Sequence, residues 1–176
     1  MPQGFSAAVG GTSDIFLSVK GAKSGVIKGE SQDSVHPNEI DVVRWSWGME
    51  SKAGLGGGTT AKGRAIVREL KIVKRFDSAS TPLMSALRSN EMITKAVLVQ
   101  RKAGKGQLEF LKITIEQGRV TELTVEAGDE EDQNSTDLLE YVSFSFNKIS
   151  VEYTPQGKDG QAQGSMTFID EWSGGA

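Results

Sequence analysis

The chain has 176 residues, 37% of them hydrophobic, a formal net charge of -3 and no cysteine. This length suits one domain with its own core, and the absence of cysteine excludes disulfides, thiolate catalysis and cysteine-ligated zinc. The acidic balance and the scattered basic residues argue against nucleic-acid binding, and the apolar runs are too short for membrane insertion. We therefore expect a single domain over 1–176, with flexible ends at 1–13 and 173–176.

The start of the chain predicts a strand followed by a long polar turn. Ile15, Leu17 and Val19 recur at every second residue, which is the period of a half-buried strand. Residues 21–39 are polar, contain glycine and include the only histidine of the chain. We expect an elaborated turn over this segment.

The next predicted strand ends in two tryptophans. Val43, Trp45 and Trp47 share one of its faces. Arg44 and Ser46 share the other face. Because tryptophan buries a large apolar area, we expect both tryptophans in the structural core. The opposite face then meets solvent, a lumen or a partner.

A long glycine-rich loop follows, over about 49–64. Gly58 and Gly63 have the spacing of a phosphate-binding loop, but Arg64 and Ala65 follow them where that motif has lysine and a hydroxyl residue. No nucleotide site is therefore expected. Long loops in compact domains are usually functional or disordered, which leaves two interpretations: a disordered tip, or an extended arm that becomes ordered on a partner.

A third alternating run covers 65–76. Ile66, Leu70, Ile72 and Phe76 fall on one face of this run. The pattern predicts another strand with that face directed into the core.

One helix is expected, over about 81–90. Thr81 is a suitable N-cap, and Pro82 suits the first helical position. Asn90 is suited to end the helix in a left-handed conformation. A helix this short needs tertiary packing to persist.

The rest of the chain predicts more strands. Runs at 95–101 and 107–117 are joined by a hairpin turn, and a second turn at Gln117–Gly118 leads into 119–127. A final short strand covers 165–172.

The run 138–153 changes its alternation phase once. Its apolar positions on the two sides of the change are Val142, Phe144 and Phe146, then Ile149, Val151 and Tyr153. A phase change of one residue indicates a bulge or a sharp bend, and such bends help a sheet to curl into a barrel.

Candidate catalytic and metal-binding residues are few. His36 lies close in sequence to Ser31, Asp33 and Ser34, but neighbours on one turn rarely converge into a triad. A single histidine does not provide the imidazole pair of a zinc site, and the acidic loop 129–132 lacks the ligand spacing of a calcium loop. We expect no enzyme activity, no metal and no cofactor, with the ring of His36 bonded to backbone or to a carboxylate.

Together these patterns predict a mainly β fold. We expect a closed or curled antiparallel barrel of two packed sheets, one flanking helix and the extended loop. The residues expected to form its structural core are bulky: Trp45, Trp47, Leu70, Ile72, Phe144 and Phe146. A barrel of about eight strands has an interior that is filled or holds one ligand, so a small-molecule-binding barrel carrier stays open as the alternative to a filled structural barrel.

Several short motifs recur in a characteristic order. They are Gly29-Glu30-Ser31 with Asp33 and His36, Ile40-Asp41-Val42 with Trp45-Ser46-Trp47-Gly48, the glycine-rich loop, Val73-Lys74-Arg75-Phe76-Asp77 with Ser80-Thr81-Pro82-Leu83, and Tyr141-Val142 to Tyr153 with Asp159-Gly160. In order and spacing they resemble the haemolysin-coregulated protein (Hcp) family, the tube component of bacterial type VI secretion. The chain departs from that pattern in a longer N-terminal tail, extra residues at 22–25 and a different ending at 169–172.

The resemblance implies a structural role. Hcp-like subunits form homohexameric rings head to tail, and the rings stack into an inner tube that sheath contraction expels. Effectors ride in the lumen, so the implied partners are further copies of the chain, the secretion sheath, the spike and effector proteins. The implied location is the bacterial cytoplasm before firing and the exterior afterwards, without a cleaved signal peptide. Neither catalysis nor a cofactor is implied.

The same resemblance points to two sets of surface residues. Ring and tube interface candidates lie along the loop: Met49, Glu50, Leu55, Gly56, Gly57, Gly58, Thr59, Lys62 and Arg64. Lumen and cargo candidates are Arg44 and Ser46, which lie opposite the tryptophan face. Deletion of 54–62 is expected to leave a folded monomer that forms no rings.

Overall fold

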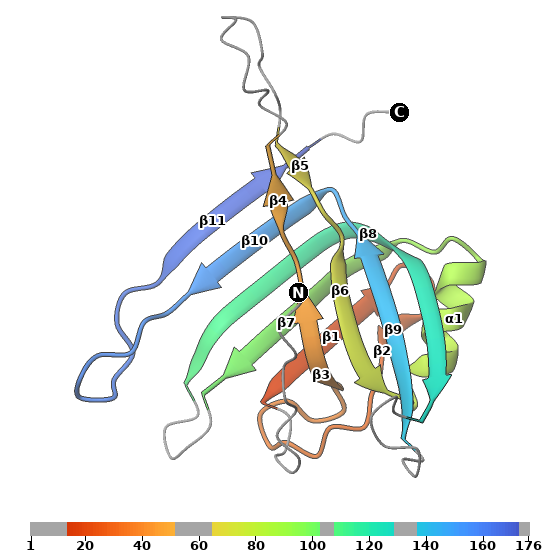
Figure 1. The fold of residues 1–176 in the computed structure, drawn as a ribbon, viewed down its shortest axis with the longest axis horizontal. Coiled ribbons are helices and arrows are strands. Elements are labelled where there is room, and N and C mark those ends of the chain that lie inside the picture. The colour runs from red at the N-terminus through yellow and green to blue at the C-terminus, as the bar shows by residue number, and fades with distance from the viewer. Residues whose placement is uncertain (1–13, 52–64, 103–107, 129–136, 173–176) are drawn as a thin grey trace, which may run out of the picture.

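The computed structural model describes residues 14–51, 65–102, 108–128 and 137–172, which form eleven strands and one helix (Figure 1). The strands are β1 (Ile15–Gly21), β2 (Gly25–Ile27), β3 (Ile40–Ser46), β4 (Met49–Glu50), β5 (Ile66–Val67), β6 (Leu70–Arg75), β7 (Ile93–Arg101), β8 (Glu109–Ala127), β9 (Leu138–Ser145), β10 (Lys148–Tyr153) and β11 (Met166–Glu171). The helix α1 (Ser80–Arg88) lies between β6 and β7.

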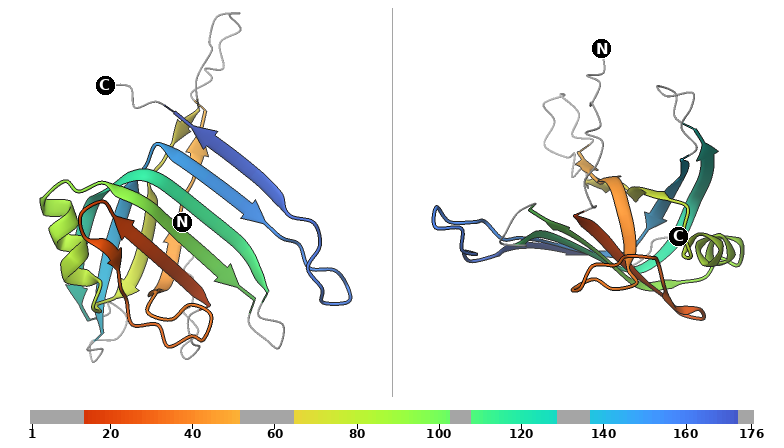
Figure 2. Two further views of the ribbon diagram at one scale, coloured as in Figure 1. Left: turned by 180° about the vertical axis from the view of Figure 1, so that it is seen from behind. Right: turned by 90° about the horizontal axis from the view of Figure 1, so that it is seen from below.

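Six strands close into an antiparallel barrel. Their order is β8, β7, β1, β3, β6 and β9, and β9 pairs again with β8. Within the described residues, β2 adds to β1, β10 and β11 extend the sheet beyond β8, and β4 with β5 forms a separate ribbon. The right view of Figure 2 shows β10 and β11 continuing the flatter side of the sheet, while β9 and the second half of β8 turn up from it. The predicted mainly β fold, with a barrel and one helix, is confirmed.

The barrel closes because β8 bends where we expected a chain reversal. The turn predicted at Gln117–Gly118 is wrong: β8 is continuous over 19 residues. As far as Gly118 it pairs with β7, and from Arg119 it pairs with β9. Gln117 has a φ of 54°, and a Cβ atom on Gly118 would lie 2.5 Å from the backbone oxygen of Ser145. Glycine therefore serves here for the close approach of β9 and not for a turn.

A second break divides the long run 138–153 into two strands. β9 ends at Ser145 and β10 starts at Lys148, so the predicted bend falls at Phe146 and Asn147. β9 pairs with β6 and β8 inside the barrel, whereas β10 pairs with β8 and β11 outside it. The phase change thus marks the point where the chain leaves the barrel.

The barrel interior is filled by large side chains. Leu17, Ile113 and Phe144 are at most 1% exposed and belong to one continuous core cluster. Burying a side chain of this size contributes about 1.5–3 kcal/mol. The packing therefore favours the filled barrel over the alternative of a hollow ligand carrier.

The helix differs from its predicted start. It begins at Ser80, and its N-cap, Ala79, makes no side-chain capping bond. The carboxylate of Asp77 instead accepts the N–H of Ala79 at 2.9 Å. Because the helix begins at Ser80, Pro82 occupies the third helical position. Asn90 ends the helix with a φ of 52°, as predicted.

Three residues that we expected on core-facing sides of strands are exposed. Val43 is exposed, because the register between β3 and β6 shifts between Val42 and Arg44. Ile66 and Phe76 are also exposed, although they alternate in phase with buried neighbours. Ile66 belongs to the separate β4–β5 ribbon, and Phe76 lies beyond the end of β6.

Candidate functional site

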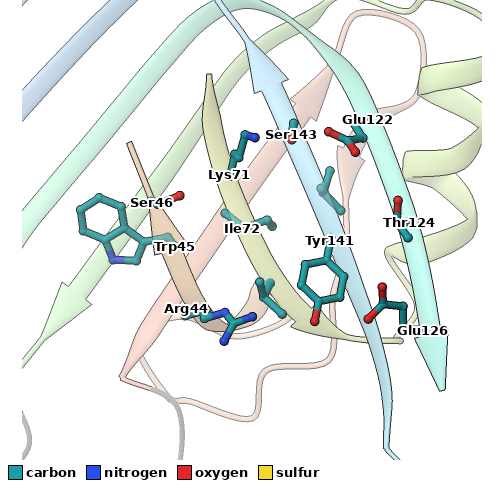
Figure 3. Close-up of a pocket in the computed structure, with 12 residues that line it drawn as sticks. Arg44, Trp45, Ser46, Lys71, Ile72, Glu122, Thr124, Glu126, Tyr141 and Ser143 are labelled. Carbon is teal, nitrogen blue, oxygen red and sulfur yellow. The ribbon is translucent and has the colours of Figure 1, made fainter. Parts of the chain in front are cut away.

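A polar depression of about 440 Å³ lies over β3, β6, β9 and the second half of β8 (Figure 3). The residues that line it are Arg44, Trp45, Ser46, Lys71, Ile72, Val73, Glu122, Thr124, Glu126, Tyr141, Val142 and Ser143. We call this surface the polar face. Both lumen candidates, Arg44 and Ser46, lie on it and are exposed.

The strand register arranges the polar face in rows that cross four strands. One row runs from Ser46 through Lys71 and Ser143 to Glu122. The next row runs in parallel; it consists of Arg44, Val73, Tyr141 and Thr124. Basic side chains therefore stand on β3 and β6, and acidic side chains stand on β8, as Figure 3 shows.

The charged side chains of the polar face interact little with the other residues that the structure describes. The guanidinium of Arg44 lies 5.9 Å from the ring centroid of Tyr141, within cation–π distance. The side chains of Lys71, Glu122 and Glu126 make no hydrogen bond or ion pair with any other residue that the structure describes. These side chains are available to a ligand or partner.

The two tryptophans connect the polar face to the core and to β7. Trp45 and Trp47 are partly buried and pack against the core cluster. The indole Nε1 of Trp45 donates to Oε1 of Gln100 on β7 at 2.9 Å. The other expected core residues lie inside the barrel: Leu70, Ile72 and Phe144 are at most 1% exposed, and Phe146 is 6% exposed.

A second uncovered surface lies on the β10–β11 extension. Residues Ile149, Val151 and Tyr153 share one face of β10, because side chains alternate along a strand. Ile149 is fully buried in the core, whereas Tyr153 is 44% exposed. The core-facing side of the sheet therefore continues along β10 beyond the barrel. At Tyr153 no other part of the described chain covers it.

Strand β11 completes this surface. Phe168 pairs with Val151, and Met166 pairs with Tyr153. Phe168 is 42% exposed and Met166 is 64% exposed. On the other side of β10, Leu111 of β8 pairs with Tyr153. We call the five residues Leu111, Val151, Tyr153, Met166 and Phe168 the apolar shelf. Among the described strands β11 pairs only with β10, so its outer edge is also open.

The loop candidates are placed only in part. Met49 and Glu50 form β4, which pairs with β5 and projects from the barrel (Figure 1). The carboxylate of Glu50 accepts a hydrogen bond from Arg68, which links β4 to the residue that follows β5. The remaining candidates, which are Leu55, Gly56, Gly57, Gly58, Thr59, Lys62 and Arg64, lie outside the described residues.

The buried ring of His36 lies between two carboxylates. Its Nδ1 lies 3.0 Å from Oε2 of Glu39, and its Nε2 lies 2.9 Å from Oε1 of Glu109. Its ring stacks on Phe16 with the centroids 4.6 Å apart. Burial raises the pKa of Glu39, although His36 acts in the opposite direction. Both ring nitrogens face carboxylates, so neither is placed to activate a serine.

The ring of Phe16 also lies near an ion pair between Arg101 and Asp33. The guanidinium of Arg101 lies 4.7 Å from that ring centroid and donates to Oδ2 of Asp33 at 2.7 Å. This hydrogen bond is the main cause that lowers the pKa of Asp33 to about 2. Asp33 also accepts the backbone N–H groups of Val35 and His36. These interactions tie the segment 28–39 to the barrel wall.

A buried ion pair that sequence reasoning missed links β6, β9 and α1. Lys74 and Glu140 are both 0% exposed and in contact. The Nζ of Lys74 also donates to Asp77 at 2.7 Å and to Ser80 at 2.9 Å. The available signal was alternation: Lys74 continues the phase of the buried Ile72. This network positions the start of α1 against the barrel.

No metal centre or membrane-spanning helix is found in the described parts of the chain. There, no three histidine, aspartate or glutamate side chains are grouped to hold a metal ion. The helix α1 is also too short to cross a membrane.

Comparison with known proteins identifies the class to which this barrel belongs. The family model described as "Type VI secretion system effector, Hcp" matches residues 16–153. Protein hcp1 of Pseudomonas aeruginosa is 38% identical over 144 residues, which cover 81% of this chain and 86% of that protein. The chain is thus a structural β-barrel protein of type VI secretion. It belongs to the Hcp family, which confirms the resemblance.

Solved structures agree with this assignment. A type VI secretion system effector from Yersinia pestis is 27% identical with a TM-score of 0.70, and the match covers 90% of this chain and 100% of that one. Hcp1 from Salmonella typhimurium is 29% identical with a TM-score of 0.68, and the match covers 90% and 95% of the two chains. The chain therefore shares its overall fold with these solved structures.

Proposed function

We propose that this protein is the subunit of a type VI secretion tube. Six copies form a ring, rings stack into a tube that sheath contraction expels, and effectors are carried in the lumen. The observation that carries this proposal is the apolar shelf, where a core-facing sheet surface leaves the barrel and stays uncovered in a single copy.

The apolar shelf supports self-association of a particular kind. Phe168 and Met166 expose large apolar groups side by side on one flank of the molecule, and the open edge of β11 lies next to them. A closed ring joins two different surfaces of identical copies, head to tail. The shelf is one such surface; the other is the flank of the neighbouring copy that covers it.

The polar face and the loop base support the other parts of the proposal. The polar face is exposed and hydrophilic, as the wall of a water-filled channel must be, and it includes Arg44 and Ser46. The β4–β5 ribbon projects from the barrel and contains Met49 and Glu50, which contact the next ring. Sheath, spike and effector proteins are the further partners. The protein acts without catalysis, first in the bacterial cytoplasm and then outside the cell.

The test compares two Phe→Asp variants by sedimentation velocity. Phe168 on the shelf is 42% exposed, and Phe76, which lies off the shelf, is 39% exposed. We expect the wild-type chain and Phe76→Asp to sediment as one hexameric species, and Phe168→Asp to sediment as single copies with an unchanged circular dichroism spectrum. If Phe168→Asp assembles as the wild type does, the shelf is not the ring contact.

A further inference from the structure

We propose that the polar face recognises polypeptide segments that carry an acidic and a basic side chain about 10 Å apart, in preference to nucleic acids or uniformly charged chains. This inference deepens the proposed tube function and rests on it for the placement of the face in a lumen. The chemistry of recognition itself lies within one copy.

The two sides of the polar face carry opposite charge. We call them its two banks: one is formed by β3 and β6, and the other by β8. Arg44 and Lys71 stand on β3 and β6, and Glu122 and Glu126 stand on β8 (Figure 3). Three of these four side chains have no polar partner among the described residues, and Arg44 has only the ring of Tyr141. Charged side chains that are held in a depression and not paired with each other are suited to pair with a bound molecule.

The strand register sets the spacing between the banks. Lys71 pairs with Ser143, and Ser143 pairs with Glu122, so Lys71 and Glu122 are two strands apart. Two strand spacings place their Cα atoms about 10 Å apart. Ser143 lies between them and is only 4% exposed, so it forms the floor of the depression. A segment that spans this floor places one charge over each bank.

Hydroxyl groups near the floor favour a polypeptide. Ser46, Thr124 and Tyr141 line the same depression, and each hydroxyl both donates and accepts hydrogen bonds. Peptide N–H and C=O groups need both functions. The face thus offers two charges of opposite sign with hydrogen-bonding groups beside and between them.

The same arrangement disfavours nucleic acids and uniformly charged chains. A phosphate chain that reaches Lys71 is repelled by Glu122 and Glu126, and a polybasic chain is repelled by Arg44 and Lys71. Nucleic-acid sites are instead basic along their whole length. Exposed charge pairs are weak, roughly two- to fivefold in affinity each, so a ring gains affinity by presenting several copies.

The experiment uses fluorescein-labelled peptides of twelve residues in a Gly-Ser background, at low ionic strength. One peptide carries Glu and Lys three residues apart, one carries two Glu, one carries two Lys, and a thymidine oligonucleotide is the fourth probe. Fluorescence anisotropy is measured with the wild type, Lys71→Glu, the swap Lys71→Glu/Glu122→Lys, and Lys28→Glu. The last is an exposed residue away from the depression and gives the same change of net charge.

We expect the mixed peptide to bind the wild type at least threefold more tightly than the other three probes. Lys71→Glu should weaken the mixed peptide at least threefold, the swap should restore it to within twofold, and Lys28→Glu should leave it unchanged. The inference is overturned if the oligonucleotide or a uniformly charged peptide binds as tightly as the mixed peptide. It is equally overturned if Lys71→Glu matches Lys28→Glu, or if the swap does not restore binding.

A parallel series separates this inference from the tube function. The same probes are measured on the single-copy variant Phe168→Asp, and every protein is also examined by sedimentation. Selective binding by single copies supports the inference even where assembly is lost. Assembly without selective binding supports the tube function and overturns the inference.

Discussion

At the residue scale, the most consequential feature is the buried pair of Lys74 and Glu140. Both side chains are fully buried, and Oε1 of Glu140 has no hydrogen-bond partner among the residues that the structure describes. Removing one member of such a pair leaves an uncompensated charge, whereas replacing both with apolar groups is often neutral or stabilising. The pair therefore contributes more to fixing the position of α1 than to net stability.

Two variants test this account of the buried pair. We expect Lys74→Met to lower the free energy of unfolding by about 3–5 kcal/mol, because Glu140 then stays buried and unpaired. We expect Lys74→Met/Glu140→Leu to recover most of that loss. Urea denaturation is measured at one fixed protein concentration, since assembly itself raises apparent stability. A single variant as stable as the wild type would show that the pair is not buried in solution.

The ion pair between Asp33 and Arg101 predicts a pH dependence. The pKa of Asp33 is lowered from 3.8 to about 2 in the folded chain. A carboxyl group with a lowered pKa stabilises the fold above its ordinary pKa and loses that contribution as the pH falls through the lowered value. The stabilisation is therefore complete above about pH 5 and disappears between about pH 4 and 2.

Asp33→Asn isolates that contribution, because the amide oxygen still accepts the N–H groups of Val35 and His36. We expect the gap in melting temperature between wild type and variant to be largest near neutral pH and to shrink below pH 4. Thermal unfolding is followed across a pH series. A gap that stays constant from pH 7 to pH 2 would contradict the assigned role of Arg101.

At the element scale, the bend in β8 decides the fold. The first half of this strand pairs with β7 and its second half pairs with β9, so one continuous strand joins both sides of the barrel. The close contact between Gly118 and the backbone of Ser145 makes that bend possible. Any side chain at this position pushes β9 away.

Gly118→Ala tests the bend. The added Cβ would lie 2.5 Å from a backbone oxygen that has little room to move, and overpacking of this kind costs about 1–3 kcal/mol. The control is Gly164→Ala, where a Cβ atom meets nothing within 4 Å. We expect urea denaturation to show a loss for the first variant and little change for the second. If Gly118→Ala and Gly164→Ala were equally stable, β8 and β9 would be able to move apart at Gly118 without loss of stability, which would contradict this account.

The sequence predicted most strands and their barrel class, because period-two alternation survives in β1, β6 and β9. It did not distinguish a bend from a turn at Gln117–Gly118, since glycine after a polar residue is typical of both. It also misplaced the helix start, because Thr81 and Pro82 satisfy capping preferences that Asp77 fulfils from outside the helix. Local sequence patterns therefore predicted the strands and the helix. Long-range contacts determined where β8 bends and where α1 begins.

At the scale of the whole molecule, two surfaces depend on topology alone. The alternation of β10 is that of a buried strand, and only the position of β10 outside the closed barrel leaves Tyr153 and Phe168 uncovered. The polar face likewise brings together β3, β6, β8 and β9. Arg44 and Ser46 were found from one strand, but Lys71 and Glu122 required knowledge of the pairing.

The central claim is that this filled barrel acts by joining identical copies through the apolar shelf. The most direct test is native mass spectrometry of the wild-type chain at micromolar concentration. We expect a single assembly of about 113 kDa, six times the 18.9 kDa of one chain. A spectrum that contains only the mass of one chain would contradict the claim.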